Sequence, residues 1–185
     1  MKEYLDKVDE NGEPTGEIVE RTIAHRDGIR HRTAHLWLVR RREGKMQVLM
    51  QKRSADKDSY PGCYDISSAG HIPAGDGYTV SALRELSEEL GITAEESALV
   101  HCGDRRYRSV GEFHGKPFVN DQYSRVFIMR CELDEDGFSV QQSEIESVRW
   151  IDLDRCIEGV AKNLFLNCIS LDELEMVERT ADSIV

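Results

Sequence analysis

The sequence lacks the features that would assign it to a membrane, secreted or disulfide-linked class of protein. It holds no apolar run long enough to span a bilayer, and its first ten residues lack the apolar segment of a secretory signal. Its five cysteines are odd in number and form no Cys-x-x-Cys pair, which disfavours a disulfide framework or a structural zinc site. These absences predict a cytoplasmic protein with no membrane partner.

Basic residues are scarce relative to acidic ones. The chain has 24 Lys and Arg residues against 35 Asp and Glu residues, a net charge of −11 at pH 7. This charge opposes non-specific binding to a nucleic acid polymer. It would also repel a small anionic substrate unless a cation or a local basic patch intervenes, which favours a metal-dependent site.

Internal repeats, low-complexity segments and linkers are also absent from the sequence. The 185 residues, of which 39% are hydrophobic and 32% charged, suffice for one globular domain with a sizeable core. We therefore expect a single domain over residues 1–185.

The hydrophobic pattern predicts an α/β fold, a mixed sheet flanked by helices. Strands are expected over residues 3–8, 33–41, 46–51, 64–68, 98–107, 122–133 and 148–151. Helices are expected over 79–90, 152–159 and 171–184, the second with Asp152 as its N-cap. Residues 18–24 fit either a short strand or a turn of helix, and Asn11-Gly12 predicts a hairpin turn.

The stretch 70–92 reads as a glycine-punctuated loop running into one helix. Thr79 is the expected N-cap and Gly91 the expected residue after the last turn, where glycine adopts a left-handed conformation without strain. Apolar residues recur between them at helical spacing and predict a buried stripe: Ala82, Leu83, Leu86 and Leu90.

Three carboxylates share the opposite face of this helix. Glu85, Glu88 and Glu89 fall at i, i+3 and i+4, so they repel one another unless a hard cation such as Mg²⁺ lies among them. Arg84 can pair with Asp76 in the loop or with Glu88 one turn on. The alternative is an ordinary solvated acidic face.

The full string resembles the Nudix box, with Gly70, Arg84, Glu85, Leu86, Glu88, Glu89, Gly91 and Ile92 in register over 70–92. Asp76 departs from it, because the family has glutamate there as a structural partner of the arginine. The resemblance implies a Nudix fold whose helix presents its glutamates to a cleft. It also implies Mg²⁺ or Mn²⁺ held by Glu85, Glu88, Glu89 and the Gly70 carbonyl, with Arg84 in the catalytic group.

A second resemblance, to the isopentenyl-diphosphate isomerases, runs from about residue 4 to about residue 152. It is carried by residues 9–16, 24–31 and 51–62 and by Gly70-His71. It implies that His25, His31 and His71 match three metal-binding histidines of those isomerases, although hydrogen-bonded histidines without a metal are the alternative.

The proton-transfer residues of the isomerases are missing from this chain. Ala69 stands where they have a cysteine, and Asn120 and Gln122 stand where they have two glutamates. Amides cannot act as acid or base near neutral pH. The chain is therefore identified as an isomerase-like Nudix hydrolase.

The resemblance implies hydrolysis of a diphosphate linkage in a small molecule, typically a nucleoside diphosphate joined to a group X. Arg53 and Lys57 match positions that contact diphosphate in the isomerases, or they are solvated loop charges. The alternatives are an isopentenyl-diphosphate isomerase and a nucleotide-binding module without catalysis. A homodimer is possible, since many relatives are dimers.

Several further residues have open roles. The general base could be a box glutamate, Glu112, Glu144 or Glu146. A basic cluster could grip phosphate or form a charged strand end: Arg105, Arg106 and Arg108. Three aromatic residues could stack on a base or belong to the core: Tyr78, Phe118 and Tyr123.

Overall fold

The structure is a computed structural model and describes residues 2–184. Met1 and Val185, the ends of the expected domain, lie outside the described residues. The central sheet has seven strands: β3 (His31–Arg42), β4 (Lys45–Arg53), β5 (Tyr64–Asp65), β6 (Ser68–His71), β7 (Val100–Phe113), β8 (Lys116–Arg130) and β9 (Ile145–Asp152). Their order is β5-β4-β3-β8-β7, with β6 paired to β3 and β9 paired to β4.

Strand β3 is the centre of this sheet. It runs parallel to β8 and antiparallel to β4 and β6, so the sheet is mixed, as predicted. Its side chains alternate between two cores: Leu36 and Leu38 enter one, whereas Trp37 and Val39 enter the other. A strand buried on both faces needs apolar residues at every position, which explains the nearly unbroken apolar run in the sequence.

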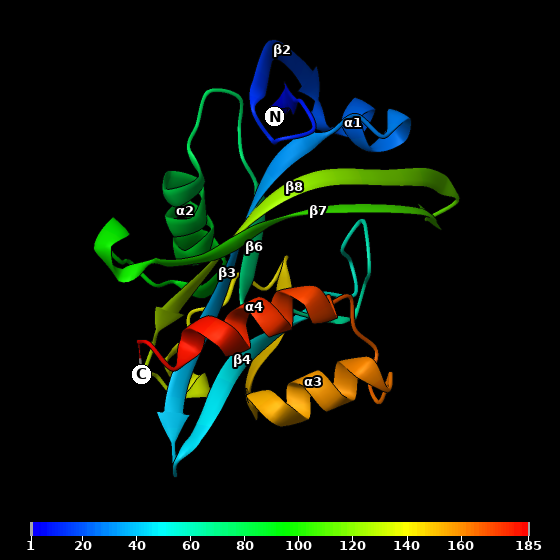
Figure 1. Cartoon of the computed structure of the whole chain (residues 1–185). Coiled ribbons are helices and arrows are strands. Elements are labelled where there is room, and N and C mark those ends of the chain that lie inside the picture. The colour runs from blue at the N-terminus through cyan, green and yellow to red at the C-terminus, as the bar shows by residue number, and fades with distance from the viewer. Residues whose placement is uncertain (1, 185) are drawn as a thin grey trace.

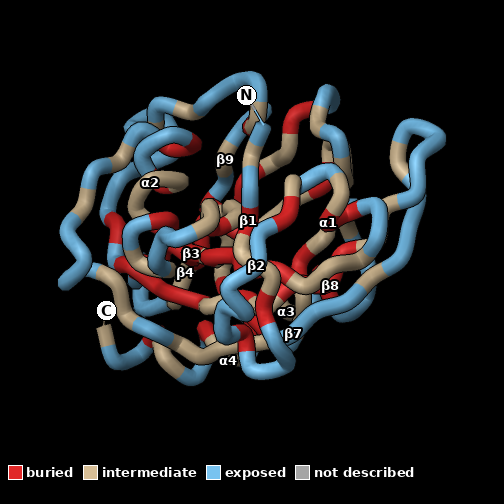
Figure 2. The backbone as a smooth tube through the Cα atoms, turned by 90° about the horizontal axis from the view of Figure 1, so that it is seen from above, coloured by how far each residue is buried: buried red, intermediate tan, exposed pale blue. Residues whose placement is uncertain are grey.

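Helices cover both faces of the sheet (Figure 1). Helix α2 (Tyr78–Leu90) packs on one face, and α3 (Leu153–Ala161) and α4 (Leu171–Ala181) pack on the other. Buried residues accordingly concentrate along the inner strands (Figure 2). No helix within residues 2–184 is long and apolar enough to cross a membrane.

The N-terminal residues form a separate two-stranded unit. β1 (Tyr4–Val8) pairs with β2 (Pro14–Glu20), and α1 (Arg21–Asp27) follows at once. The turn between the strands contains Asn11-Gly12, with Gly12 at φ +80°, and the Asp9 carboxylate accepts two backbone N–H bonds across it. The hairpin is confirmed, and residues 18–24 divide between a strand and a helix.

The β7–β8 hairpin is longer than predicted. β8 begins at Lys116 instead of residue 122, and β7 ends at Phe113 instead of residue 107. The added residues are mainly exposed or half-buried, and the hairpin projects from the body of the protein (Figure 1). Because these residues do not face a core, they lack the apolar pattern from which a strand is predicted.

The remaining differences concern short elements and helix ends. The expected strand 64–68 is two strands, β5 and β6, and short 3₁₀ turns occupy Glu96–Ala98 and Glu135–Gly137. The N-cap of α2 is Gly77, so the prediction of Thr79 was wrong, whereas Gly91 is left-handed at φ +71° as predicted. Asp152 is the N-cap of α3, but its carboxylate binds Lys45 and Gln47 rather than the helix amides.

Candidate active site

The glycine loop and its helix are held against the edge of strand β6. Gly70 pairs with Ala34 of β3, and Pro73 in the loop bridges to Leu5 of β1. Helix α2 buries Leu86 and Leu90 against the sheet. These contacts fix the position of the box glutamates relative to the backbone of β6.

A cavity of about 250 Å³ opens where α2 and β6 meet the segment before β9. We call it the acid cavity, because five carboxylates line it: Glu3, Glu85, Glu88, Glu89 and Glu144. Three cations also line it: Arg21, Lys57 and Arg84. The structure therefore brings Gly70, Arg84 and the three box glutamates together at one opening.

The three box glutamates differ in burial, so they do not form one solvated face. Glu89 is only 4% exposed, and burial raises its pKa to about 8, with repulsion from Glu85 acting in the same direction. Burial also raises the pKa of Glu85 to about 7, while Arg84 opposes the rise. The side chain of Glu88 is 55% exposed. A hard divalent cation would relieve this desolvation and repulsion, so the donor set fits Mg²⁺ or Mn²⁺.

Arg84 holds the cluster in place. Its guanidinium pairs with Glu85 at 2.8 Å and with Glu88 at 3.1 Å, and it donates to the His71 carbonyl at 3.2 Å. The expected pairing with Glu88 is therefore present. Asp76 is exposed, and its own carbonyl accepts from Arg32. Arg84 thus ties the helix to strand β6 directly, without the loop carboxylate.

Gly70 is required by space rather than by backbone conformation. A Cβ atom at this position would overlap the carboxyl group of Glu85, whereas one at Gly77 would meet no atom within 4 Å. Gly70 itself lines the acid cavity.

Replacing Gly70 by alanine is expected to lower kcat by at least tenfold, because the new methyl group displaces Glu85, and a shift of about 1 Å in a catalytic group can cost ~10²-fold. The measurement is kcat under saturating Mg²⁺, together with the melting temperature. Gly77→Ala is the matched control and should keep nearly all activity. Equal activity of the two variants would show that the position of Glu85 is unimportant.

The three candidates for the general base outside the box lie in different surroundings. Glu144 lines the acid cavity and pairs with Lys57. Glu146, two residues on, pairs with Lys52 at the surface, and Glu112 is exposed on the projecting hairpin. Neither of them lines the acid cavity. Among these three, Glu144 alone has a position from which it could act on a water molecule near the box glutamates.

The two expected substrate-binding cations have different surroundings. Lys57 lines the acid cavity and an adjoining cavity. Arg53 lines only the adjoining one, and its guanidinium donates to Asp65 at 2.8 Å and twice to the Ser59 carbonyl. Lys57 is therefore better placed to meet a phosphate, while Arg53 orders the loop that carries Lys57.

The basic cluster after the box splits between two sides of β7. Arg105 points to Glu173 and Ser170 of the C-terminal segment. Arg106 pairs with Asp121 across the hairpin, and Arg108 is exposed. Because side chains alternate along a strand, the three arginines do not form one phosphate-gripping group.

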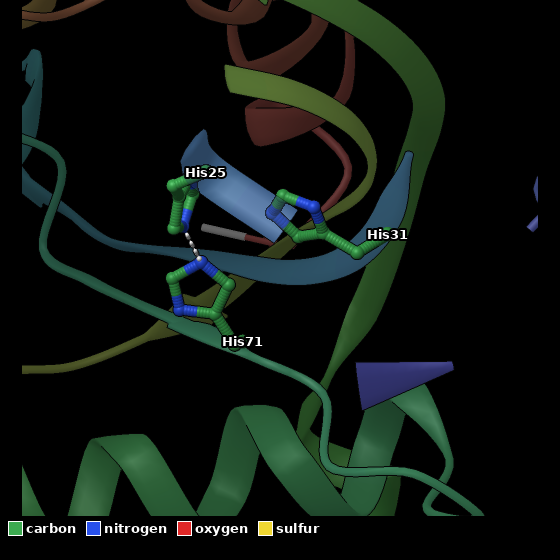
Figure 3. Close-up of side chains that lie close together, drawn as sticks. All are labelled: His25, His31 and His71. Carbon is green, nitrogen blue, oxygen red and sulfur yellow. Dashed lines mark hydrogen bonds between the residues drawn. The ribbon is translucent and has the colours of Figure 1, made fainter. Parts of the chain in front are cut away.

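Three histidines lie close together (Figure 3), and one of them, His71, lines the acid cavity. One ring nitrogen from each of His25, His31 and His71 lies within 4.8 Å of the others, and the Nε2 atoms of His25 and His71 are 3.0 Å apart. Burial lowers the pKa of all three, which keeps the imidazoles in the neutral form that binds metals.

His31 shows which nitrogen is available. Its Nδ1 donates to the Ile29 carbonyl, so its buried Nε2 carries a lone pair that has no partner among the described residues. His25, His31 and His71 could together hold a transition-metal ion, for which imidazole is a suitable ligand. Gln122 of β8 pairs with His31 of β3, and Asn120 donates to the Gln122 side chain at 2.7 Å.

A larger cavity of about 520 Å³ is lined by His25 and His71. Phe118 lines it and stacks on His25 with ring centroids 4.5 Å apart. Tyr78 instead lies under the guanidinium of Arg125, and Tyr123 packs against Gly12. Of the three aromatic residues considered for stacking, Phe118 is the one that lines a cavity in this region.

Three residues of the site have no motif in the sequence. Arg21, the first residue of α1, lines all three cavities. His35 and Glu173 meet in the cavity next to the acid cavity, although 138 positions separate them. Of these three residues, only Glu173 could have been noticed in the sequence, because it is a charged residue beside Leu174 on the apolar side of the predicted terminal helix.

Comparison with known proteins identifies relatives over most of the chain. Residues 29–165 match the NUDIX domain. The chain is 38% identical over 152 residues to Nudix hydrolase 3 of Arabidopsis thaliana, which covers 81% of this chain but 19% of that protein. It is 31% identical over 153 residues to an uncharacterized Nudix hydrolase of Clostridium acetobutylicum, covering 83% of this chain and 71% of that one.

Among solved structures, DR0079 from Deinococcus radiodurans has a similar fold. The two superpose with a TM-score of 0.66, covering 96% of this chain and 98% of the other at 21% sequence identity. At that identity the likeness concerns the fold, a mixed sheet between helices.

Proposed function

This chain belongs to the Nudix domain family, and from that premise we propose that it hydrolyses the diphosphate linkage of a nucleoside diphosphate joined to a group X. The observation that carries the proposal is the acid cavity, in which Glu85, Glu88 and Glu89 lie beside the Gly70 backbone. Carboxylate and carbonyl oxygens are the ligands of Mg²⁺, which commonly shares its coordination with substrate phosphates.

A bound divalent cation would neutralise charge on the phosphoryl oxygens and hold the attacking water. Lys57 and Arg21 line both the acid cavity and its neighbour, and their charges would hold the remaining phosphate oxygens between the two. Arg84 keeps Glu85 and Glu88 in position. Water attacks one phosphorus, the bridging P–O bond breaks, and two phosphate-bearing products leave.

Glu144 is the residue that we assign to accept the proton of the attacking water, since it lines the acid cavity and is held by Lys57. Changing Glu144 to Gln is expected to lower kcat about 10²-fold, within the range for loss of a general base. Glu146→Gln serves as the control and should stay near the wild-type rate. If both variants turn over normally, the base is another group.

The functional test is a screen of nucleoside diphosphate derivatives and prenyl diphosphates with Mg²⁺, read as released phosphate products. We expect turnover of nucleoside diphosphate derivatives that stops on chelation and returns when Mg²⁺ or Mn²⁺ is added back. Unchanged turnover after chelation would overturn the metal-dependent mechanism. Calorimetric binding of a nucleotide without product would instead favour a sensing module.

The sequence resemblance between residues 4 and 152 supports placing the chain in the isomerase-like branch of the family. An isomerase activity is less well supported, because Ala69 and Gln122 cannot transfer protons. Deuterium uptake from solvent into an allylic product would revive that alternative.

A further inference from the structure

The cavity that adjoins the acid cavity, and that Lys57 and Arg53 also line, has a volume of about 260 Å³. We call it the polar cavity. Both cavities are lined by the same connecting residues: Arg21, Lys57, Ala69, Gly70 and His71. A diphosphate held over these residues would therefore place the reacting phosphate on the glutamate side and the attached group on the polar side. This argument rests on the proposed function.

Many of the residues that line the polar cavity but not the acid cavity carry hydrogen-bonding groups. Thr33 and His35 come from β3, Gln122 from β8, Arg105 from β7, and Glu173 from α4. The buried Glu173 carboxylate accepts from His35 Nδ1 at 2.9 Å and from Trp37 Nε1 at 2.9 Å. Burial tends to raise the pKa of Glu173, but its partners, above all His35 and Arg105, outweigh this effect and lower the pKa.

His35 offers an acceptor to the cavity. In the neutral imidazole, the nitrogen that faces the Glu173 carboxylate, Nδ1, carries the proton, and Nε2 carries the lone pair. Gln122 Nε2 and Thr33 Oγ1 each lie 3.3 Å from this Nε2. Both distances are longer than a strong hydrogen bond. A ligand hydroxyl could replace either contact.

Arg105 offers a donor to the same cavity. Its side chain is 9% exposed, with Nη1 at 3.3 Å from Glu173 and Nη2 at 2.8 Å from Ser170. Its buried Nε–H has no partner among the described residues. Because this Nε has almost no accessible surface, a ligand in the cavity would meet the outer part of the guanidinium and not Nε.

We propose that the polar cavity binds the group X and that X is a small hydroxylated group such as a sugar. Hydroxyls both donate and accept, which matches the lone pair of His35 and the donors of Gln122 and Arg105. A prenyl chain would bury the same groups against hydrocarbon without replacing their bonds with water. The volume lies just below the usual range for ligand pockets, about 300–1,000 Å³, so X is small.

The first test compares substrates on the wild-type protein with Mg²⁺. We expect kcat/KM for ADP-ribose or UDP-glucose to exceed that for ADP and for geranyl diphosphate by tenfold or more. Equal efficiency with ADP, or higher efficiency with geranyl diphosphate, would overturn the assignment of X while leaving diphosphate hydrolysis in place. Failure of every compound would instead count against the proposed function itself.

The second test locates the sugar. Gln122→Leu should lower kcat/KM for the preferred sugar-linked compound about tenfold more than it lowers that for ADP, mainly through KM, as expected for one lost hydrogen bond. Gln47→Leu is the matched control, since Gln47 is a bonded, part-buried amide that lines neither cavity. Thr33→Val provides a second variant if Gln122→Leu unfolds. An equal loss on both compounds would place X elsewhere.

Discussion

Replacing Glu88 by glutamine is expected to lower kcat about 10³-fold, with almost no change in thermal stability. The amide is neutral and a weaker ligand for a hard cation, so charge that develops on the phosphoryl oxygens loses its stabilisation, an effect of ~10²–10³-fold for a single group. The fold should be unaffected, because the Glu88 side chain is 55% exposed and its bond from Arg84 is at the surface.

The measurement is kcat from released phosphate product at saturating Mg²⁺, together with the melting temperature. Glu96→Gln is the matched control, since Glu96 is an exposed glutamate of the 3₁₀ turn Glu96–Ala98, away from the cavities. It should behave as wild type. A Glu88→Gln protein with the wild-type rate would remove Glu88 from the mechanism.

Replacing Glu173 by alanine is expected to lower the free energy of unfolding by about 3–5 kcal/mol, the range for removing one partner of a buried ion pair. The change leaves Arg105 buried without its counter-charge. It also leaves the Trp37 and His35 N–H groups without an acceptor. These three groups come from β7 and β3, so the loss should loosen α4 from the sheet.

Urea unfolding of the metal-free protein measures this effect. Glu175→Ala on the same helix is the control: Glu175 is exposed and lies 3.9 Å from Arg179, a geometry in which a helix pair contributes little. Its free energy of unfolding should stay within about 0.5 kcal/mol of wild type. A Glu173→Ala protein as stable as the control would mean that the carboxylate is dispensable to the fold.

Features with a short-range cause could be predicted well. The apolar run from Leu36 to Val39 indicated a strand, and the spacing of Leu86 and Leu90 indicated the packed face of α2. The Gly91 helix end followed from backbone sterics alone. The N-cap was wrongly predicted at Thr79. The actual cap, Gly77, has no side-chain oxygen that would mark it as an N-cap in the sequence.

Features with a long-range cause could not be predicted. The sequence offered Glu112, Glu144 and Glu146 equally, and the packing of the segment before β9 against α2 and β6 brought only Glu144 to the acid cavity. The burial of single glutamates was also not predictable: Glu85, Glu88 and Glu89 were expected to share one helix face, but Glu89 is buried because strand β6 covers that side, where the Ala69 amide donates to its carboxylate at 3.3 Å.

The sequence by itself determined the chemistry of the box: which side chains are carboxylates, their one-turn spacing, and the glycines that let backbone and helix approach. The tertiary structure alone decided which distant groups face them, from Arg21 at the start of α1 to Glu173 in α4. The physical reason is that helix and strand preferences act between residues a few positions apart. Burial of apolar surface, in contrast, joins segments at any separation and thereby sets the composition of a cavity wall.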